Sequence, residues 1–156
     1  STSMNELMPQ VRRIGSTLQG LKVVTSSIKN TYKKGEAICL DFKLVNVLDK
    51  PLVIDGRIDP RAHLFFDLRD AEGKRIKYTV IRAKLVAESK RDFVLLRGKD
   101  YFYGVYLSLP QKQYNLTKPR RYSLRVQYEG FATGNRFGLH AWTGTVTSST
   151  VSFEIK

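Results

Sequence analysis

The sequence predicts an all-β fold from residue 20 onward, an antiparallel sandwich of two sheets. Hydrophobic residues recur at every second position in five separate segments, which is the period of a strand with one buried face. Turn residues separate these segments, and no long stretch follows the helical period. Seven or more strands without helices between them are typical of a sandwich, and a small barrel is the structural alternative.

The chain is expected to divide at Gly20. Residues 1–19 show no sustained period and mix glycine, serine and threonine with charge, so we expect a flexible, irregular leader with one helical turn near residues 5–12. Residues 20–156 are then a single sandwich domain, because a chain of 156 residues is long enough to bury one core but not two.

Strands are expected where the alternation is sustained, over residues 37–48, 63–70, 75–86, 101–109, 122–128 and 151–155. The sequence AEGK at residues 71–74 is expected to be a hairpin turn joining the second and third of these strands. Residues 49–62 contain two prolines and one glycine and are expected to form the longest loop.

The alternation also predicts which side chains face the core. The central ones are expected to be Phe42, Phe66, Leu124, Val126 and Phe153. Others on the same faces are Ile38, Leu40, Leu44, Leu64, Leu68, Tyr101, Tyr103, Val105, Leu107, Leu109, Tyr122, Tyr128, Val151 and Ile155. The same phase turns His63 away from the core.

The stretch LTKPRRYSLRV, residues 116–126, resembles the corner of fibronectin-III and other immunoglobulin-like sandwiches. In that corner a leucine and a proline precede a tyrosine that opens the penultimate strand, and the tyrosine hydroxyl bonds back to the corner backbone. Leu116, Pro119 and Tyr122 take these positions. The resemblance implies a hydrogen bond from Tyr122 to a backbone group within residues 114–119.

A second stretch, FVLLRGKDYFYGVYLSL at residues 93–109, is similar to a segment of immunoglobulin-like domains in secreted and bacterial-envelope proteins. These include domains that precede zinc endopeptidases of the deuterolysin and lysine-specific type. The usual proline-glycine before each strand is replaced by Leu96-Arg97-Gly98 and Pro119-Arg120-Arg121. The resemblance covers residues 20–156 and implies a secreted, periplasmic or cell-envelope location, and the absence of the peptidase's HExxH motif means that no catalytic role carries over.

Positive charge is the extreme feature of the composition. The chain has 27 lysines and arginines against 14 acidic residues, a net charge of +13, which favours an anionic partner but also serves solubility. In an immunoglobulin-like sandwich three of the turns lie at one end, and here these turns are rich in basic residues. The candidate polyanion- or partner-binding residues, which we call the basic pole, are Lys33, Lys34, Lys74, Arg75, Lys112, Lys118, Arg120 and Arg121. The alternative is that they only keep the turns solvated.

A glycine-rich aromatic loop at residues 128–144 is expected at the opposite end. Its candidate ligand-binding residues are Phe131, Arg136, Phe137, His140 and Trp142, because loops on a rigid scaffold often carry function. The alternative is that Phe137 and Trp142 fold back to cover the core.

No motif indicates catalysis. His63 and His140 stand far apart, and the sequence has no nucleophile elbow, P-loop or dinucleotide fingerprint. A single cysteine, Cys39, excludes an internal disulfide and is expected to pack as a small hydrophobe in a strand. Asp55, Asp59 and Asp67 can meet in space around a hard cation, but their spacing does not indicate it.

We therefore expect a non-catalytic binding module, monomeric, without cofactor, metal or membrane span, whose partner is a protein or an acidic polymer. Two alternatives remain open at this point. One is a polyanion-binding module that uses the basic pole. The other is a proteinase-inhibitor-like domain, because bacterial intracellular proteinase inhibitors have a similar sandwich.

Overall fold

The computed structural model describes residues 17–83 and 86–156, which form two facing sheets and a short two-stranded ribbon. The first sheet contains β1 (Thr17–Leu18), β2 (Leu21–Ser27), β4 (Ile38–Asn46) and β8 (Phe102–Leu109), all antiparallel in that order. β4 pairs with β2 along one edge and with β8 along the other, and its side chains alternate between buried and half-buried positions over most of its length. This alternation gives the sheet one face that points into the core.

The second sheet is built around β9 (Arg121–Gly130). On one side β9 pairs with β6 (Leu64–Arg69), and on the other it pairs with β11 (Val151–Ile155) and β10 (Gly144–Thr147) in succession. All these pairs are antiparallel. β3 (Thr31–Tyr32) completes the sheet by pairing in parallel with β11.

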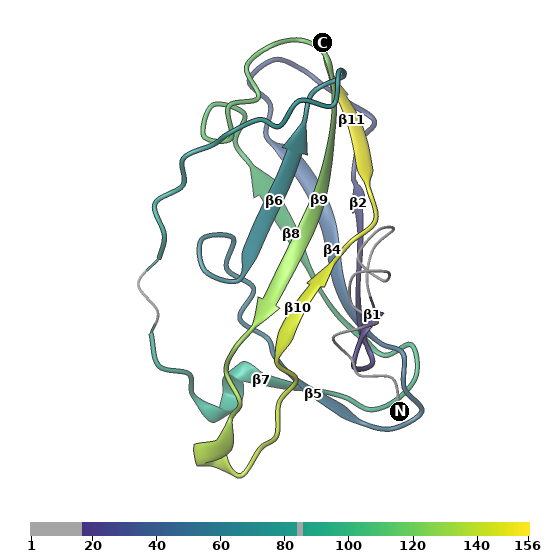
Figure 1. Ribbon diagram of the computed structural model, residues 1–156, viewed down its shortest axis with the longest axis vertical. Helices are drawn as coiled ribbons and strands as arrows, with labels where there is room; N and C mark the ends of the chain where they lie inside the picture. The colour runs from purple at the N-terminus through teal and green to yellow at the C-terminus, as the bar shows by residue number, and fades with distance from the viewer. Residues whose placement is uncertain (1–16, 84–85) are drawn as a thin grey trace.

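The two sheets lie face to face, with β6, β9, β10 and β11 in front of β4 and β8 in Figure 1. The ribbon of β5 (Leu52–Asp55) and β7 (Phe93–Leu96) lies at the end opposite the C-terminus (Figure 1). Two short 3-10 helices, η1 (Lys90–Asp92) and η2 (Asn135–Phe137), precede β7 and β10. The predicted all-β sandwich is confirmed, and neither sheet of the described residues closes into the alternative barrel.

The core follows the predicted alternation closely. All five residues expected at its centre, Phe42, Phe66, Leu124, Val126 and Phe153, are at most 2% exposed. The segment 101–109 is the exception, because Leu107 and Leu109 are buried whereas Tyr103 and Val105 are only half-buried, and Tyr101, just before β8, is exposed. Cys39 is half-buried in β4.

The predicted corner is also present. The Tyr122 hydroxyl donates to the Lys118 carbonyl oxygen at 2.6 Å, within the expected range of residues 114–119. The ring of Tyr122 is 3% exposed and stacks on Phe153, with 5.8 Å between ring centroids. The corner therefore ties the β8–β9 connection to the core.

Two expectations about connections were wrong. Residues 52–55 lie in the predicted long loop but form β5, which pairs with β7. The strand expected at residues 75–86 does not form over its described part, where one isolated bridge joins Arg69 and Arg75 and residues 76–83 have no strand. The hairpin turn at 71–74 does form, with Asp70 N–H donating to the Lys74 carbonyl oxygen at 3.0 Å.

The predicted leader is only partly described. Residues 1–16, including the helical turn expected near 5–12, lie outside the described residues. Thr17 and Leu18 form β1 and pair with Lys22 and Leu21. The expected boundary at Gly20 therefore falls inside a β1–β2 hairpin, where Gly20 has a φ of 87° that favours glycine.

Candidate functional site

Three connections meet at one end of the sandwich, beside the C-terminus in Figure 1: residues 33–37, 70–75 and 110–120. Gln111 fastens the first of these to the third. Its side-chain amide is buried, donates to the carbonyl oxygens of Lys33 at 2.8 Å and Glu36 at 2.7 Å, and accepts from Gly35 N–H at 2.9 Å. A buried amide with satisfied hydrogen bonds fixes two loops relative to each other.

Arg120 fastens the second connection to the third. Its guanidinium lies 3.3 Å from an Asp70 carboxylate oxygen and 3.7 Å from Glu72. Although burial raises the pKa of Asp70, backbone N–H groups of Lys74 and Glu72 and the charge of Arg120 hold this pKa below its usual value. Asp70 therefore stays ionised as the anchor of this end.

The second and third of these connections, with the residues that follow each of them, line a hollow of about 230 Å³. Its charged lining consists of one acid, Asp70, and five basic residues among the described ones: Lys74, Arg75, Lys77, Lys118 and Arg120. Four of these five belong to the predicted basic pole. Asn115 and Thr117 add an amide and a hydroxyl. A shallow site with this lining suits a small anionic group such as a sulfate, phosphate or carboxylate.

Lys77 was not predicted as a site residue. The sequence places Lys77 in the strand expected at residues 75–86. Its position two residues after Arg75 was the signal that could have identified it as a site residue. Asn115 places this part of the chain against the hollow, because its side-chain amide donates to the Lys77 carbonyl oxygen at 3.3 Å.

The other four predicted residues of the basic pole do not line the hollow. Lys33, Lys34 and Lys112 are exposed on the two loops that Gln111 joins. Arg121 is exposed at the start of β9, opposite Glu154 of β11. These four therefore lie at the same end of the sandwich as the hollow, without contributing to its lining.

Acidic partners neutralise part of this end. Glu36 pairs with Lys29 and also accepts from Lys33 N–H at 2.9 Å, and these contacts lower the pKa of Glu36. Arg75 lies 3.5 Å from Asp67. The side chains of Lys74 and Lys118, in contrast, are exposed and have no acidic partner among the described residues.

The aromatic loop at the opposite end is largely occupied by its own contacts. Trp142 is 4% exposed, stacks on Tyr128 with 5.9 Å between ring centroids and donates its backbone N–H to the Val53 carbonyl oxygen, so its place is that of the alternative, a ring that covers the core. Large rings cover the core here because the loop folds back over β5. Phe137 is half-buried against Phe93, at 6.2 Å.

The remaining predicted residues of this loop are held in different ways. The Arg136 guanidinium lies over the Phe137 ring at 4.7 Å and donates to the carbonyl oxygen of Glu88. Phe131 stacks on His63 with 4.9 Å between centroids. His140 is exposed.

His63 is buried, at 4% exposure, although its phase predicted a side chain pointing away from the core. His63 lies in the turn just before β6 rather than in the strand, and Phe131 from a distant loop stacks on it. Asp59 N–H donates to His63 Nδ1 at 3.4 Å, and His63 Nε2 lies 3.8 Å from the buried carboxylate of Asp55. Burial lowers the pKa of His63, while Asp55 opposes the shift.

The acids considered for a cation site are each paired with an arginine. Asp55 lies 2.7 Å from Arg57, Asp59 lies 3.6 Å from Arg61, and Asp67 lies 3.1 Å from Arg69. In residues 17–83 and 86–156 no group of three or more histidine, cysteine or acidic side chains is placed to hold a metal ion.

The same residues include no helix with the length and apolar character needed to cross a membrane. The sequence matches no protein-family model and no curated protein.

Proposed function

We propose that this domain is a non-catalytic binding module that recognises an anionic partner through the basic pole. The observation that carries the proposal is the hollow of about 230 Å³, in which five basic side chains and one carboxylate line the same surface. Like charges gathered at one place repel one another, although solvent weakens that cost for exposed groups. Binding of an anion would offset the repulsion and would form charge-assisted hydrogen bonds.

Lys74 and Lys118 are the best-placed residues for such contacts. Both side chains are exposed, and neither ammonium group has an acidic partner among the described residues. Arg120 is different, because it also holds Asp70 and so supports the turn itself. We assign anion contact to the two lysines, and both anion contact and positioning to Arg120.

The test compares two charge reversals of equal size. One variant is Lys74→Glu with Lys118→Glu at the hollow. The control is Lys50→Glu with Lys99→Glu, two exposed residues beyond the far ends of β4 and β7. Binding of fluorescein-labelled heparin is measured for each variant over a range of salt concentrations.

The hollow variant should bind at least about tenfold more weakly than wild type, with a smaller dependence of affinity on salt because fewer counterions are released. The control should lose far less. Equal losses in both variants would mean that only net charge matters, and this would contradict a defined anion site.

We also propose kinship with immunoglobulin-like and fibronectin-III-like domains, in an exported protein. The support is the split into a β2-β4-β8 sheet and a β6-β9-β10/β11 sheet, together with the Tyr122 corner. The proposal of a secreted or cell-envelope location follows from the resemblance of residues 93–109. Fractionation of the native host with an antibody against the domain tests it.

A further inference from the structure

The outer edge of β6 is only partly paired. The β6–β9 register, with Glu129 N–H donating to His63, directs the odd-numbered residues of β6 to bond with β9. The even-numbered residues Leu64, Phe66 and Leu68 therefore direct their N–H and C=O groups away from β9. An open edge of this kind is a template for another strand.

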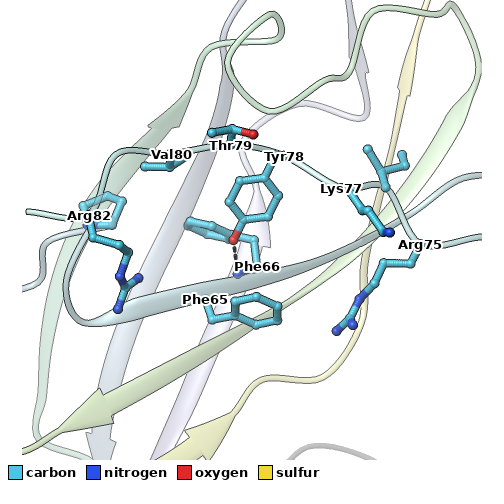
Figure 2. A pocket seen from close by; sticks show the side chains of 10 residues that line it. Phe65, Phe66, Arg75, Lys77, Tyr78, Thr79, Val80 and Arg82 are labelled. Carbon is cyan, nitrogen blue, oxygen red and sulfur yellow. Dashed lines mark hydrogen bonds between the residues drawn. The ribbon is translucent and has the colours of Figure 1, made fainter.

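The chain after β6 starts to cover this edge and then leaves it. Ile76 N–H donates to the Leu68 carbonyl oxygen at 2.8 Å, as in a hairpin. Two residues later the backbone pairing stops. At this point the side chain of Tyr78, and not the backbone of Tyr78, contacts β6. The Tyr78 hydroxyl accepts from Phe66 N–H at 3.0 Å, and Figure 2 shows the ring standing between the two chain segments.

Tyr78 thus holds its own segment a side chain's length from β6, and Figure 1 shows this segment bowed away from the sheet. Among the described residues, the Leu68 N–H and the Phe66 C=O have no hydrogen-bond partner. They remain available to an added strand.

The space left at this edge is a groove of about 500 Å³. Its apolar part includes Phe65, which is 42% exposed, and the half-buried Tyr78 and Val80. Its charged lining within the described residues is entirely basic: Arg75, Lys77 and Arg82. Arg75 and Arg82 lie at opposite ends of the groove, with Phe65 between them in Figure 2.

The groove is continuous with the hollow of the basic pole. Arg75, Ile76 and Lys77 line both. A partner protein that places an acidic group in the hollow can therefore extend its chain along β6 through the groove.

We propose that this groove binds an extended acidic peptide of a partner protein, which adds as a strand to the β6 edge. An apolar side chain of the peptide packs on Phe65 and Tyr78, and acidic side chains on either side of it meet Arg75 and Arg82. The peptide backbone bonds to the Phe66 C=O and the Leu68 N–H, the two groups that Tyr78 and Ile76 leave without a partner. This inference rests on the proposed function, because it names the partner of the basic pole as a protein segment.

The probe is a fluorescein-labelled peptide, acetyl-Glu-Thr-Glu-Val-Phe-Val-Glu-Thr-Glu. Its matched control has the same sequence with N-methyl groups on alternate backbone nitrogens, which keeps every side chain but removes the donors of one edge. Affinities are measured by fluorescence anisotropy, and hydrogen exchange of the Leu68 amide is followed by NMR. Protein variants are Arg82→Glu at the groove and Lys50→Glu as a charge control.

We expect the plain peptide to bind at least about tenfold more tightly than the N-methylated one, because the donor to the Phe66 C=O is lost and the N-methyl groups keep the backbones apart. The Leu68 amide should exchange more slowly in the complex. Arg82→Glu should weaken binding about tenfold, and Lys50→Glu should change it little.

Equal affinity of the two peptides, or unchanged exchange at Leu68, would overturn strand addition even if heparin still binds the pole. Tighter binding of a single-stranded DNA oligonucleotide than of the peptide would likewise overturn it and would leave a polyanion site. One further outcome would contradict the proposed function alone. In it, the Lys74→Glu, Lys118→Glu variant loses no more heparin affinity than the Lys50→Glu, Lys99→Glu control, while the plain peptide still binds more tightly than the N-methylated one.

Discussion

The Tyr122 hydroxyl donates to the Lys118 carbonyl oxygen at 2.6 Å, and this bond closes the turn that carries Lys118 and Arg120 to the edge of the hollow. Tyr122 itself is buried against Phe153. The core therefore sets the position of the basic residues through one side chain. A binding surface made of loops gains rigidity when a buried group holds its backbone in this way.

Replacing Tyr122 with Phe should lower the free energy of unfolding by about 1 kcal/mol, the usual contribution of one hydrogen bond. The ring stays in the core, so packing is preserved. Urea unfolding curves at neutral pH measure the change. Curves that coincide with wild type would show that the bond contributes nothing to the corner.

Replacing Tyr78 with Phe should also cost about 1 kcal/mol, because Phe66 N–H loses the acceptor that it has at 3.0 Å. Burial raises the pKa of Tyr78, in keeping with a neutral hydroxyl in this place. Hydrogen exchange by NMR should show faster exchange of the Phe66 amide in the variant. An unchanged Phe66 exchange rate would argue against the hydroxyl as the spacer between residues 76–83 and β6.

Stability should fall as the pH is lowered through the usual pKa of histidine, and His63 should cause part of the fall. Its folded-state pKa lies below the model-peptide value of 6.5, mainly because of burial. Between these two pKa values the unfolded chain binds more protons, so stability is present above pH 6.5 and decreases below it. The charged groups around it are Asp55, Arg57, Asp59 and Arg82.

Free energies of unfolding at pH 7.5 and 5.5 check this prediction. The difference between them should shrink in His63→Leu and stay near the wild-type value in His140→Gln, because His140 is exposed. If this difference is the same in His63→Leu as in wild type, the pKa of His63 is the same in the folded and the unfolded state.

Trp142 should behave as a core residue rather than as a ligand contact. Trp142→Ala should cost about 3–5 kcal/mol, as large-to-small changes in cores do. His140→Ala in the same loop should change stability by less than about 0.5 kcal/mol. Thermal or urea unfolding measures both, and similar values for the two variants would contradict the burial of Trp142.

The sequence predicted the faces of the strands better than it predicted their partners. Leu124 and Val126 are buried as expected, because alternation decides which side chains point inward. Alternation does not decide whether a backbone reaches a neighbour. Ile76 and Tyr78 do pack toward the core, but the Tyr78 side chain keeps their segment from joining the sheet.

Features that depend on contacts between distant segments could not be predicted from the sequence. β5 has only four residues beside a proline and a glycine, and it becomes a strand because β7 pairs with it. His63 is buried in contacts with Phe131 and Asp55, which come from other parts of the chain. The turns of the basic pole were placed from the inferred topology, whereas Lys77 was missed because its segment was assigned to a strand.

The central claim is that anions bind at the basic pole, and an NMR titration that locates the binding tests it most directly. A ¹⁵N-labelled sample is titrated with a heparin hexasaccharide at low salt, and backbone amide shifts are followed. The account predicts saturable shifts concentrated at residues 70–77 and 115–120, with small changes around Lys50, Lys99 and the loop at 131–143. Shifts that are spread over the surface without saturating, or that centre on the loop at 131–143, would contradict it.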